Sequence, residues 1–487
     1  MQYDASLEPV LVTGAGGFVG GYLTRYLHHH GVPVRAMVRN REKAADLISM
    51  GIEVVEADLL NHESLERVVK GCGSIMHIAA IFRQAGLPDS DYYKANVDGT
   101  KALLDFAVKY KVKRFIHCST VGVHSNCPDA PADESAEYSP ADIYQVTKME
   151  GEKIALDYFR SGKIQGSVIR PAMIYGPGDM RTLKLFKTIS KNRFFYVGSG
   201  QANVHFIDVR DLVRAFTMAL ENTSINGEVF IIAGKESVSL QTIVTKISEM
   251  IGVSAPRLHL PVVPLQILGD ICEAFCTPFK INPPIFRRRV DFFTKHRHFS
   301  GSKAERMLGF KPSLNLDQEL REIIDWYATH GFLPTPSHTR QLAKIQTALP
   351  REQMASHPYG STQHLALGQF KQIVEQGQFS VDEKTSVLLR YYDGTINFWN
   401  KGSQEVYGWN RYEAEGRISH HILQTQFPES LDKINKQLIN ERRWSGNLLH
   451  TSRDGQLIEV ESLWQVLDVF KSANKQIIIE TNIPKAA

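Results

Sequence analysis

The feature that most constrains this chain is a short apolar strand that runs directly into a glycine-rich turn. Residues 10–20 read Val-Leu-Val-Thr-Gly-Ala-Gly-Gly-Phe-Val-Gly, so Gly14, Gly17 and Gly20 fall between a buried strand and a helix that begins near Phe18. Glycine is needed because such a turn takes backbone angles closed to other residues and lets a diphosphate approach the main chain. The helix start offers free N–H groups and a positive dipole end to that diphosphate. The pattern predicts a dinucleotide-binding turn, with a purely structural glycine turn as the alternative.

From residue 8 to about 235, apolar runs alternate with helical patterns. Their continuous hydrophobicity is typical of strands buried on both faces of a parallel sheet. The runs cover 10–13, 33–38, 52–56, 74–78, 113–118, 165–170 and 228–232. Helices are expected at 18–30, 41–49, 62–70, 99–109, 140–160 and 209–221. The predicted fold class is therefore α/β, a doubly wound parallel Rossmann sheet that binds ligands at the carboxyl ends of its strands.

Composition excludes several classes of partner. The net charge of +4 is small for 487 residues, so no nucleic acid is expected. Five cysteines without zinc-type spacing indicate reduced thiols in a cytoplasmic protein, and no metal site is predicted. No signal peptide is expected, because the first strand begins by Pro9. No apolar run reaches the roughly 18 residues that a spanning helix needs. The irregular apolar stretch 258–279 leaves peripheral membrane contact, or a cover over a pocket, as possibilities.

After residue 235 the regular alternation of apolar runs and helical patterns ends. Residues 172–205 and 236–333 are expected to form a small substrate lobe, which includes a basic run at 286–289. Residues 334–379 are rich in Gln, Ser, Thr, His and Pro, and are expected to be a linker with a short helix near 364–376.

The region 380–487 is predicted to be a separate antiparallel α+β domain. Turn signals at Asp393-Gly394 and Asp454-Gly455 separate strand patterns. The strands are expected at 387–391, 395–399, 446–451, 456–466 and 475–481.

A second chemical signal is the pair Tyr144 and Lys148. A spacing of four places both on one face of a helix. A nearby ammonium favours the phenolate and would lower the pKa of Tyr144 from its ordinary value of about 10. Ser119 and Thr120 follow the preceding strand and supply hydroxyls at its carboxyl end. An ordinary surface helix is the alternative.

In this order and spacing, the residues resemble the extended short-chain dehydrogenase/reductase family over residues 8–333. The motifs are Thr13-Gly14-Ala-Gly-Gly17-Phe-Val-Gly20, Asp58-Leu59, His77-Ile-Ala79-Ala80, Asn96-Val97, Ser119-Thr120, Tyr144-xxx-Lys148 and Arg170-Pro171-Ala-Met-Ile-Tyr-Gly-Pro-Gly. The resemblance implies that Tyr144 passes the proton and Lys148 holds the nicotinamide ribose. The residues expected at the dinucleotide are Gly14, Gly17, Phe18, Val19, Gly20, Arg39, Asp58, Leu59, Ala79, Ala80, Asn96, Tyr144, Lys148 and Pro171.

Two assignments remain open: which hydroxyl is catalytic, and whether the dinucleotide is NADP or NAD. Counting back from Val123-His124, where the family usually shows Val-Tyr, puts the catalytic hydroxyl on Thr120, with Ser119 as the fallback. Arg39 ends the second strand where an NAD enzyme usually has an acidic residue, so NADP is favoured and NAD stays possible.

The substrate is narrowed only to a class. The lobe resembles the branch that includes hydroxysteroid dehydrogenases, dihydroflavonol reductases and some nucleotide-sugar epimerases. An apolar cover favours a hydrophobic alcohol or ketone, and therefore an NADP(H)-dependent oxidoreductase. The alternatives are a nucleotide-sugar epimerase with tightly bound NAD, and a dinucleotide-binding redox sensor without significant turnover.

The last region, 380–487, looks like a PAS sensor domain. The matching residues are Tyr392-Asp-Gly-Thr-Ile-Asn-Phe-Trp399-Asn400, Glu405-Val-Tyr-Gly408-Trp409, Glu415-Gly416-Arg417 and Trp444-Ser-Gly-Asn…Arg453-Asp-Gly455. No cysteine lies beyond residue 276, so flavin-adduct photochemistry is not expected. The ligand of this domain is unknown, and the domain is expected to sense a signal or to support a homodimer.

Overall fold

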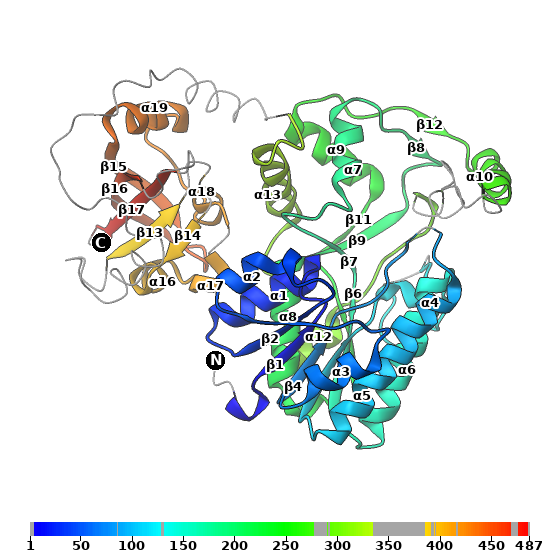
Figure 1. Cartoon of the computed structure of the whole chain (residues 1–487). Coiled ribbons are helices and arrows are strands. Elements are labelled where there is room, and N and C mark those ends of the chain that lie inside the picture. The colour runs from blue at the N-terminus through cyan, green and yellow to red at the C-terminus, as the bar shows by residue number, and fades with distance from the viewer. Residues whose placement is uncertain are drawn as a thin grey trace. The chain divides into compact units, whose positions relative to one another are not determined.

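The structure is a computed structural model that describes residues 4–84, 86–127, 131–276, 290, 293–334, 385–390, 394, 396–414, 417–468 and 476–485. The chain divides into two compact units, Met1–Pro334 and Thr335–Ala487 (Figure 1). The basic run at 287–289, residues 335–379 of the predicted linker with its short helix, and the turn residue Asp393 lie outside the described residues.

A seven-stranded parallel sheet forms the centre of the first unit. Its strand order is β10-β6-β5-β4-β1-β2-β3, and every neighbouring pair runs parallel. The strands are β1 (Val10–Thr13), β2 (Val34–Val38), β3 (Glu53–Glu56), β4 (Ser74–His77), β5 (Arg114–Cys118), β6 (Gln165–Pro171) and β10 (Val229–Ile232). The predicted doubly wound sheet is confirmed. Its order reverses between β1 and β4, where the carboxyl ends of such sheets border a ligand crevice.

Helices cover both faces of this sheet (Figure 1). On one face, α1 (Phe18–His29), α2 (Ala45–Ser49) and α8 (Val209–Glu221) share an apolar cluster with β1 and β2. On the other face lie α3 (His62–Val69), α5 (Gly99–Lys109) and α6 (Ile143–Arg160). The short α4 (Asp89–Tyr93), which joins α5 through a π-helical turn at Lys94–Asp98, was not predicted.

A smaller lobe follows the main sheet. Its strands are β7 (Met173–Tyr175), β9 (Asn203–Asp208) and β11 (Ser237–Ser239) in one sheet, and β8 (Tyr196–Val197) with β12 (His259–Leu260) in another. Its helices are α7 (Leu183–Ser190), α9 (Leu240–Ile251), α10 (Val262–Cys276) and α13 (Leu316–Thr329). One part of the range 236–333 lies elsewhere. The helix α12 (Ser302–Leu308) buries Ala304 and Leu308 in the same cluster as α8 and β10.

The second unit is a five-stranded antiparallel sheet with helices. The strand order is β14-β13-β17-β16-β15. The strands are β13 (Ser386–Arg390), β14 (Ile396–Trp399), β15 (Arg443–Thr451), β16 (Leu457–Asp468) and β17 (Gln476–Pro484). Between β14 and β15 lie α16 (Lys401–Tyr407), α17 (Arg411–Ala414), α18 (Ser419–Ile422) and α19 (Leu431–Glu441). Across the described parts of both units, no helix combines the length and apolarity that crossing a bilayer requires.

Candidate active site

The glycine turn between β1 and α1 leaves no room for side chains. Gly14 has a left-handed φ of 72°, and a Cβ placed on it would lie 3.0 Å from the Cα of Ala79. A Cβ on Gly20 would lie 2.2 Å from the carbonyl oxygen of Gly14, so α1 packs directly on the turn. Gly17 caps α1, and its amide donates to the Gly14 carbonyl at 2.9 Å. The first turn of α1 therefore presents N–H groups above a bare backbone cradle, which fits a diphosphate.

Thr13 ties this turn to the end of β4. Its hydroxyl accepts the amides of Ile78 and Ala79, each at 3.0 Å, so its own hydrogen points to Nδ1 of His77 at 2.9 Å. The other ring nitrogen of His77 then carries the proton and donates to the Thr100 hydroxyl at 3.0 Å. Burial lowers the pKa of His77 to about 3, which agrees with this neutral tautomer. The chain of hydrogen bonds fixes the segment that follows β4, where Ala79 and Ala80 lie.

Asn96 holds the same segment from its other side. Its amide oxygen accepts the Ile81 amide at 2.8 Å, and its Nδ2 donates to the Ile81 carbonyl at 3.1 Å and to the Thr147 hydroxyl at 3.0 Å. The side chain is 1% exposed. Asn96 was predicted to lie at the dinucleotide. In the structure its side chain binds the backbone of Ile81 beside the crevice.

The end of β2 carries an unengaged arginine. Arg39 is exposed, and within the described part of the chain it has no hydrogen bond or ion pair. Its neighbour Arg41 differs, because its guanidinium donates to the Val54 carbonyl and its amide donates to the Glu56 carboxylate at 3.1 Å. Arg39 is therefore the cation at this strand end that is available to a ligand.

The predicted residues after β3 shape the neighbouring wall. Asp58 accepts the amide of Leu60 at 3.0 Å. Leu59 is buried against the start of α5, where a Cβ on Gly99 would lie 3.0 Å from that of Leu59. At other strand ends, Pro171 closes β6. Of the first residues of α1, Val19 is buried in the core and Phe18 lies with its ring centre 5.3 Å from the Arg181 guanidinium.

Ser119 is held in a buried ion-pair network. Its hydroxyl donates to Glu152, whose carboxylate also accepts the Tyr138 hydroxyl at 2.7 Å and Nε of Arg170 at 3.1 Å. Glu152 is 0% exposed and Arg170 is 2% exposed. Arg170 also donates to Nε2 of His124 at 2.9 Å, which fixes that histidine as a neutral acceptor. The Ser119 hydroxyl therefore donates its hydrogen bond to Glu152, so this hydrogen is not available to a substrate.

Thr120 is placed differently. Its oxygen accepts the Gly122 amide at 3.0 Å and so caps the short helix at Val121–His124. Its hydroxyl hydrogen has no acceptor among the described residues, and the residue is only half-buried. Of the two predicted hydroxyls, Thr120 is therefore the one with a free proton.

Tyr144 lies in the first turn of α6 within an aromatic and cationic setting. Its ring meets Phe82 edge-on at 5.0 Å, and the Arg83 guanidinium lies 5.4 Å from the ring centre. Arg83 is oriented by Asp142, the cap of α6, at 2.8 Å. Burial raises the pKa of Tyr144 well above its ordinary value, and Arg83 partly opposes that shift.

Lys148 is fully inside the fold at the next turn of α6. Its ammonium donates to the Cys118 carbonyl at 2.6 Å, and burial lowers its pKa. The expectation that Lys148 lowers the pKa of Tyr144 is therefore not met in this structure. The ammonium is engaged by the end of β5, and removal of the phenol from water dominates.

The sequence analysis missed the residues that support this site. Glu152 and Arg83 were not predicted, yet they fix Ser119 and contact Tyr144, respectively. The spacing of Tyr144, Lys148 and Glu152, four residues apart on one helix face, was the signal that could have found Glu152.

This arrangement suits proton transfer to or from an oxygen atom. The Tyr144 hydroxyl has no hydrogen-bond partner among the described residues, and the Thr120 proton is free to orient a substrate oxygen. When bound, a nicotinamide dinucleotide supplies or accepts a hydride. The glycine cradle fits its diphosphate, and Lys148 lies one turn from Tyr144, where its remaining N–H groups can hold a ribose hydroxyl.

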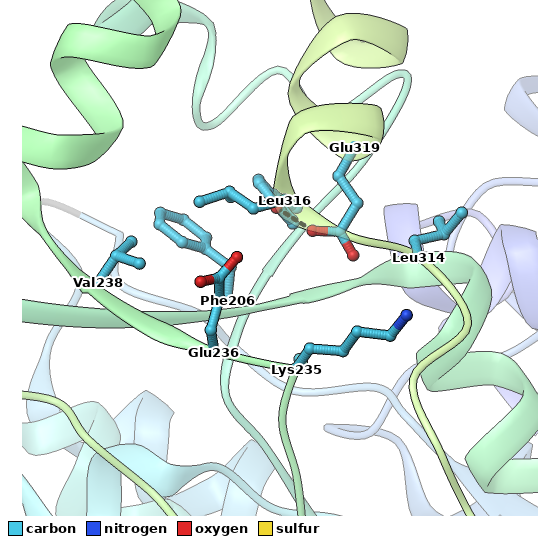
Figure 2. Close-up of a pocket in the computed structure, with 9 residues that line it drawn as sticks. Phe206, Lys235, Glu236, Val238, Leu314, Leu316 and Glu319 are labelled. Carbon is cyan, nitrogen blue, oxygen red and sulfur yellow. Dashed lines mark hydrogen bonds between the residues drawn. The ribbon is translucent and has the colours of Figure 1, made fainter. Parts of the chain in front are cut away.

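A separate hollow in the lobe contains none of these residues. Figure 2 shows it between Phe206 on β9, Glu319 on α13 and the chain at Lys235 and Glu236. Tyr175 also lines this hollow, and its hydroxyl donates a hydrogen bond to the Glu319 carboxylate. Burial, with Asp208 nearby, raises the pKa of Glu319 to about 8. None of the residues predicted at the active site lines this hollow, so it is distinct from that site.

Comparisons with known proteins agree with this fold. Residues 10–233 match the NAD dependent epimerase/dehydratase family. The 3beta-hydroxysteroid-dehydrogenase/decarboxylase isoform 1 of Arabidopsis thaliana is 27% identical, over 65% of this chain and 79% of its own. The 4-hydroxy-2-methyl-3-oxo-4-farnesyl-3,4-dihydroquinoline-1-oxide ketoreductase of Stigmatella aurantiaca is 27% identical, over 63% of this chain and 93% of its own. A UDP-glucuronic acid 4-epimerase from Bacillus cereus, solved with NAD, has a TM-score of 0.54 and 25% identity, over 66% of this chain and 99% of its own. Residues 10–233 of the first unit are thus similar to the NAD dependent epimerase/dehydratase family, and the relatives carry the similarity over about two thirds of the chain.

Proposed function

We propose that the first unit is an NADP(H)-dependent oxidoreductase that interconverts an alcohol and a ketone on a hydrophobic steroid-, flavonol- or lipid-like substrate. The observation that carries the proposal is that neither the Tyr144 hydroxyl nor the Thr120 hydroxyl hydrogen has a partner among the described residues, and Thr120 follows the carboxyl end of β5. The similarity to a hydroxysteroid dehydrogenase and to a ketoreductase of a farnesylated ring supports the substrate class.

In the reducing direction the proton balance is simple. A bound NADPH would supply the hydride to the carbonyl carbon, and Tyr144 would give its proton to the carbonyl oxygen. Thr120 donates a hydrogen bond to the same oxygen, and Lys148 holds the ribose near Tyr144. Oxidation of the alcohol reverses each of these transfers.

Consumption of NADPH with a panel of apolar ketones tests the reaction. Tyr144→Phe is expected to lower kcat/KM by about 10²–10⁴-fold, because it removes only the proton donor. Tyr93→Phe, at an exposed tyrosine of α4, is the matched control and should change little. Equal rates for Tyr144→Phe and the wild type would refute the assignment.

Arg39 supports the preference for NADP. An unengaged guanidinium at the end of β2 can receive a 2′-phosphate through its planar fork. Arg39→Asp should lower the ratio of NADPH affinity to NADH affinity by about 10-fold or more, because the aspartate would repel the 2′-phosphate that the arginine attracts. Arg67→Asp makes the same charge change at an exposed site on α3 and is the control. An unchanged preference in Arg39→Asp would refute the role of Arg39 in selecting NADP.

The second candidate is a nucleotide-sugar epimerase, which the likeness to the UDP-glucuronic acid 4-epimerase favours. Such an enzyme would interconvert UDP-sugars without net change in the dinucleotide. Incubation with UDP-glucuronic acid and related sugars, followed by chromatography, separates the two. Epimer formation without any ketone reduction would decide for this alternative.

We also propose that the second unit is a PAS sensor or dimerisation module. Its five-stranded antiparallel sheet, with helices inserted between β14 and β15, supports the resemblance of its motifs. Light scattering of the full chain tests a homodimer, and mass spectrometry of the purified chain tests for a retained ligand. A monomer without any bound ligand would argue against both roles.

A further inference from the structure

The lobe helix α10 presents its apolar side to solvent. Val263, Ile267, Ile271 and Phe275 follow one another at four-residue steps, so they form one stripe along the helix. Leu268 lies beside them, and all five side chains are 47–69% exposed. A helix that only covers a protein core normally has polar residues on its outward side.

The inward side of α10 is apolar as well. Gly269 is buried, and Val262 and Leu265 are half-buried, so α10 carries more apolar surface than the lobe covers. The start of the helix is anchored, because β12 directly before it pairs with β8, and the Gly198 amide donates to the Leu260 carbonyl at 2.8 Å. In Figure 1, α10 lies at the outer margin of the lobe, beyond β8 and β12. The apolar stripe is therefore displayed by a fixed element.

We propose that α10 is a membrane-docking helix whose apolar stripe inserts into the surface of a lipid bilayer with anionic headgroups. Fifteen residues make a helix about 22 Å long, which is too short to cross the roughly 30 Å hydrocarbon core but long enough to lie in the interface.

Charge in the flanking sequence is complementary to such a surface. α10 itself has no lysine or arginine, and its charged residues are Asp270 and Glu273, so attraction to anionic headgroups has to come from cations in the flanking sequence. Arg257 is exposed before it, and the sequence after it continues through Lys280 to the run Arg287-Arg-Arg289. Cations on both sides of an apolar helix are typical of segments that bind anionic lipids. Membrane docking is independent of the proposed reaction, because neither α10 nor the flanking cations belong to the candidate active site.

Co-sedimentation of the full chain with vesicles, without dinucleotide or substrate, tests the proposal. The vesicles are phosphatidylcholine with or without phosphatidylglycerol. The wild type should sediment with the mixed vesicles and less with pure phosphatidylcholine. Ile271→Glu with Phe275→Glu should lower the partition coefficient at least about 10-fold, because two inserted side chains become charged.

A matched control lies in the second unit. Leu457 and Ile483 are 61% and 54% exposed, like Ile271 at 61%, so Leu457→Glu with Ile483→Glu makes the same chemical change on another surface. This control should bind vesicles as the wild type does. Thermal melting checks that each variant is folded, and the milder pair Ile271→Gln with Phe275→Gln replaces the glutamates if they unfold the lobe.

Three results would overturn the proposal. The first is a wild type that stays in the supernatant with both kinds of vesicle. The second is equal vesicle binding by the α10 variant and the control. The third is a dimer in light scattering that Ile271→Glu abolishes while vesicles capture nothing, which would assign the stripe to a second copy of the chain. None of these results depends on turnover of a ketone, so the proposed reaction can fail or hold separately.

Discussion

Replacement of Glu152 by glutamine should strongly destabilise the first unit. The carboxylate accepts hydrogen bonds from Ser119, Tyr138 and Arg170, and both members of the ion pair are almost fully buried. Glutamine keeps the shape but removes the charge, which leaves the Arg170 guanidinium buried without a counter-ion. Breaking a buried pair in this way costs ~3–5 kcal/mol of unfolding free energy, and burial leaves little solvent screening to reduce it. Ser119→Ala removes a single donor to the same carboxylate and should cost ~1.5–3 kcal/mol.

Hydrogen exchange of peptides from α6, measured by mass spectrometry, reports the opening free energy of this unit without interference from the second. The control is Glu150→Gln on the same helix, because Glu150 is half-buried and has no hydrogen bond or ion pair among the described residues. It should change the opening free energy by less than about 0.5 kcal/mol. If Glu152→Gln and Glu150→Gln gave equal protection, the buried pair would not hold the site together.

Two further predictions concern the turn and the histidine beneath it. Gly20→Ala should weaken NADPH binding at least about 10-fold, because its Cβ would lie 2.2 Å from the Gly14 oxygen, whereas Gly16→Ala meets nothing closer than 3.6 Å and should change it little. Fluorescence titration compares the two, and equal effects would contradict the packing argument. Because burial lowers the pKa of His77 to about 3, the unfolded chain takes up a proton below pH ~6.5 that the folded chain does not. Stability should therefore fall by up to ~5 kcal/mol as the pH drops from ~6.5 to ~3. His77→Gln should flatten urea stability against pH over that range, and an unchanged slope would refute the assignment.

The main sheet was predictable because burial on both faces leaves a direct mark on the sequence. Seven Val- and Ile-rich runs predicted seven strands, and the glycine turn fixed where the first helix begins. The lobe was harder, because its strands are only two to six residues long and four of the five have three residues or fewer. A helix such as α12 also returns to the main core through contacts far away in sequence, which local periodicity does not record.

In the candidate site, too, local patterns were predictable and long-range contacts were not. Tyr144, Lys148 and the glycines follow local patterns, so their spacing together with the family resemblance was enough to predict them. The choice between Ser119 and Thr120 depends on Glu152 and Arg170, 33 and 18 residues from their respective partners, and only the folded contacts identify which hydroxyl is engaged. Lys148 was predicted to act on Tyr144, but its ammonium reaches the Cys118 carbonyl, whose position is set by β5.

The charge states of Tyr144 and Lys148 argue for a site that donates protons. Burial raises the pKa of Tyr144 and lowers that of Lys148, so without dinucleotide the phenol keeps its proton over the whole neutral range. A donor must be protonated to act, which favours reduction of a carbonyl. Oxidation first requires a change that lowers the pKa of Tyr144, such as a nearby cationic nicotinamide. Ultraviolet difference titration against Tyr144→Phe measures this, because the variant lacks one phenol. The two proteins should form equal tyrosinate up to about pH 10 without dinucleotide, and an extra tyrosinate in the wild type well below that pH would refute the argument.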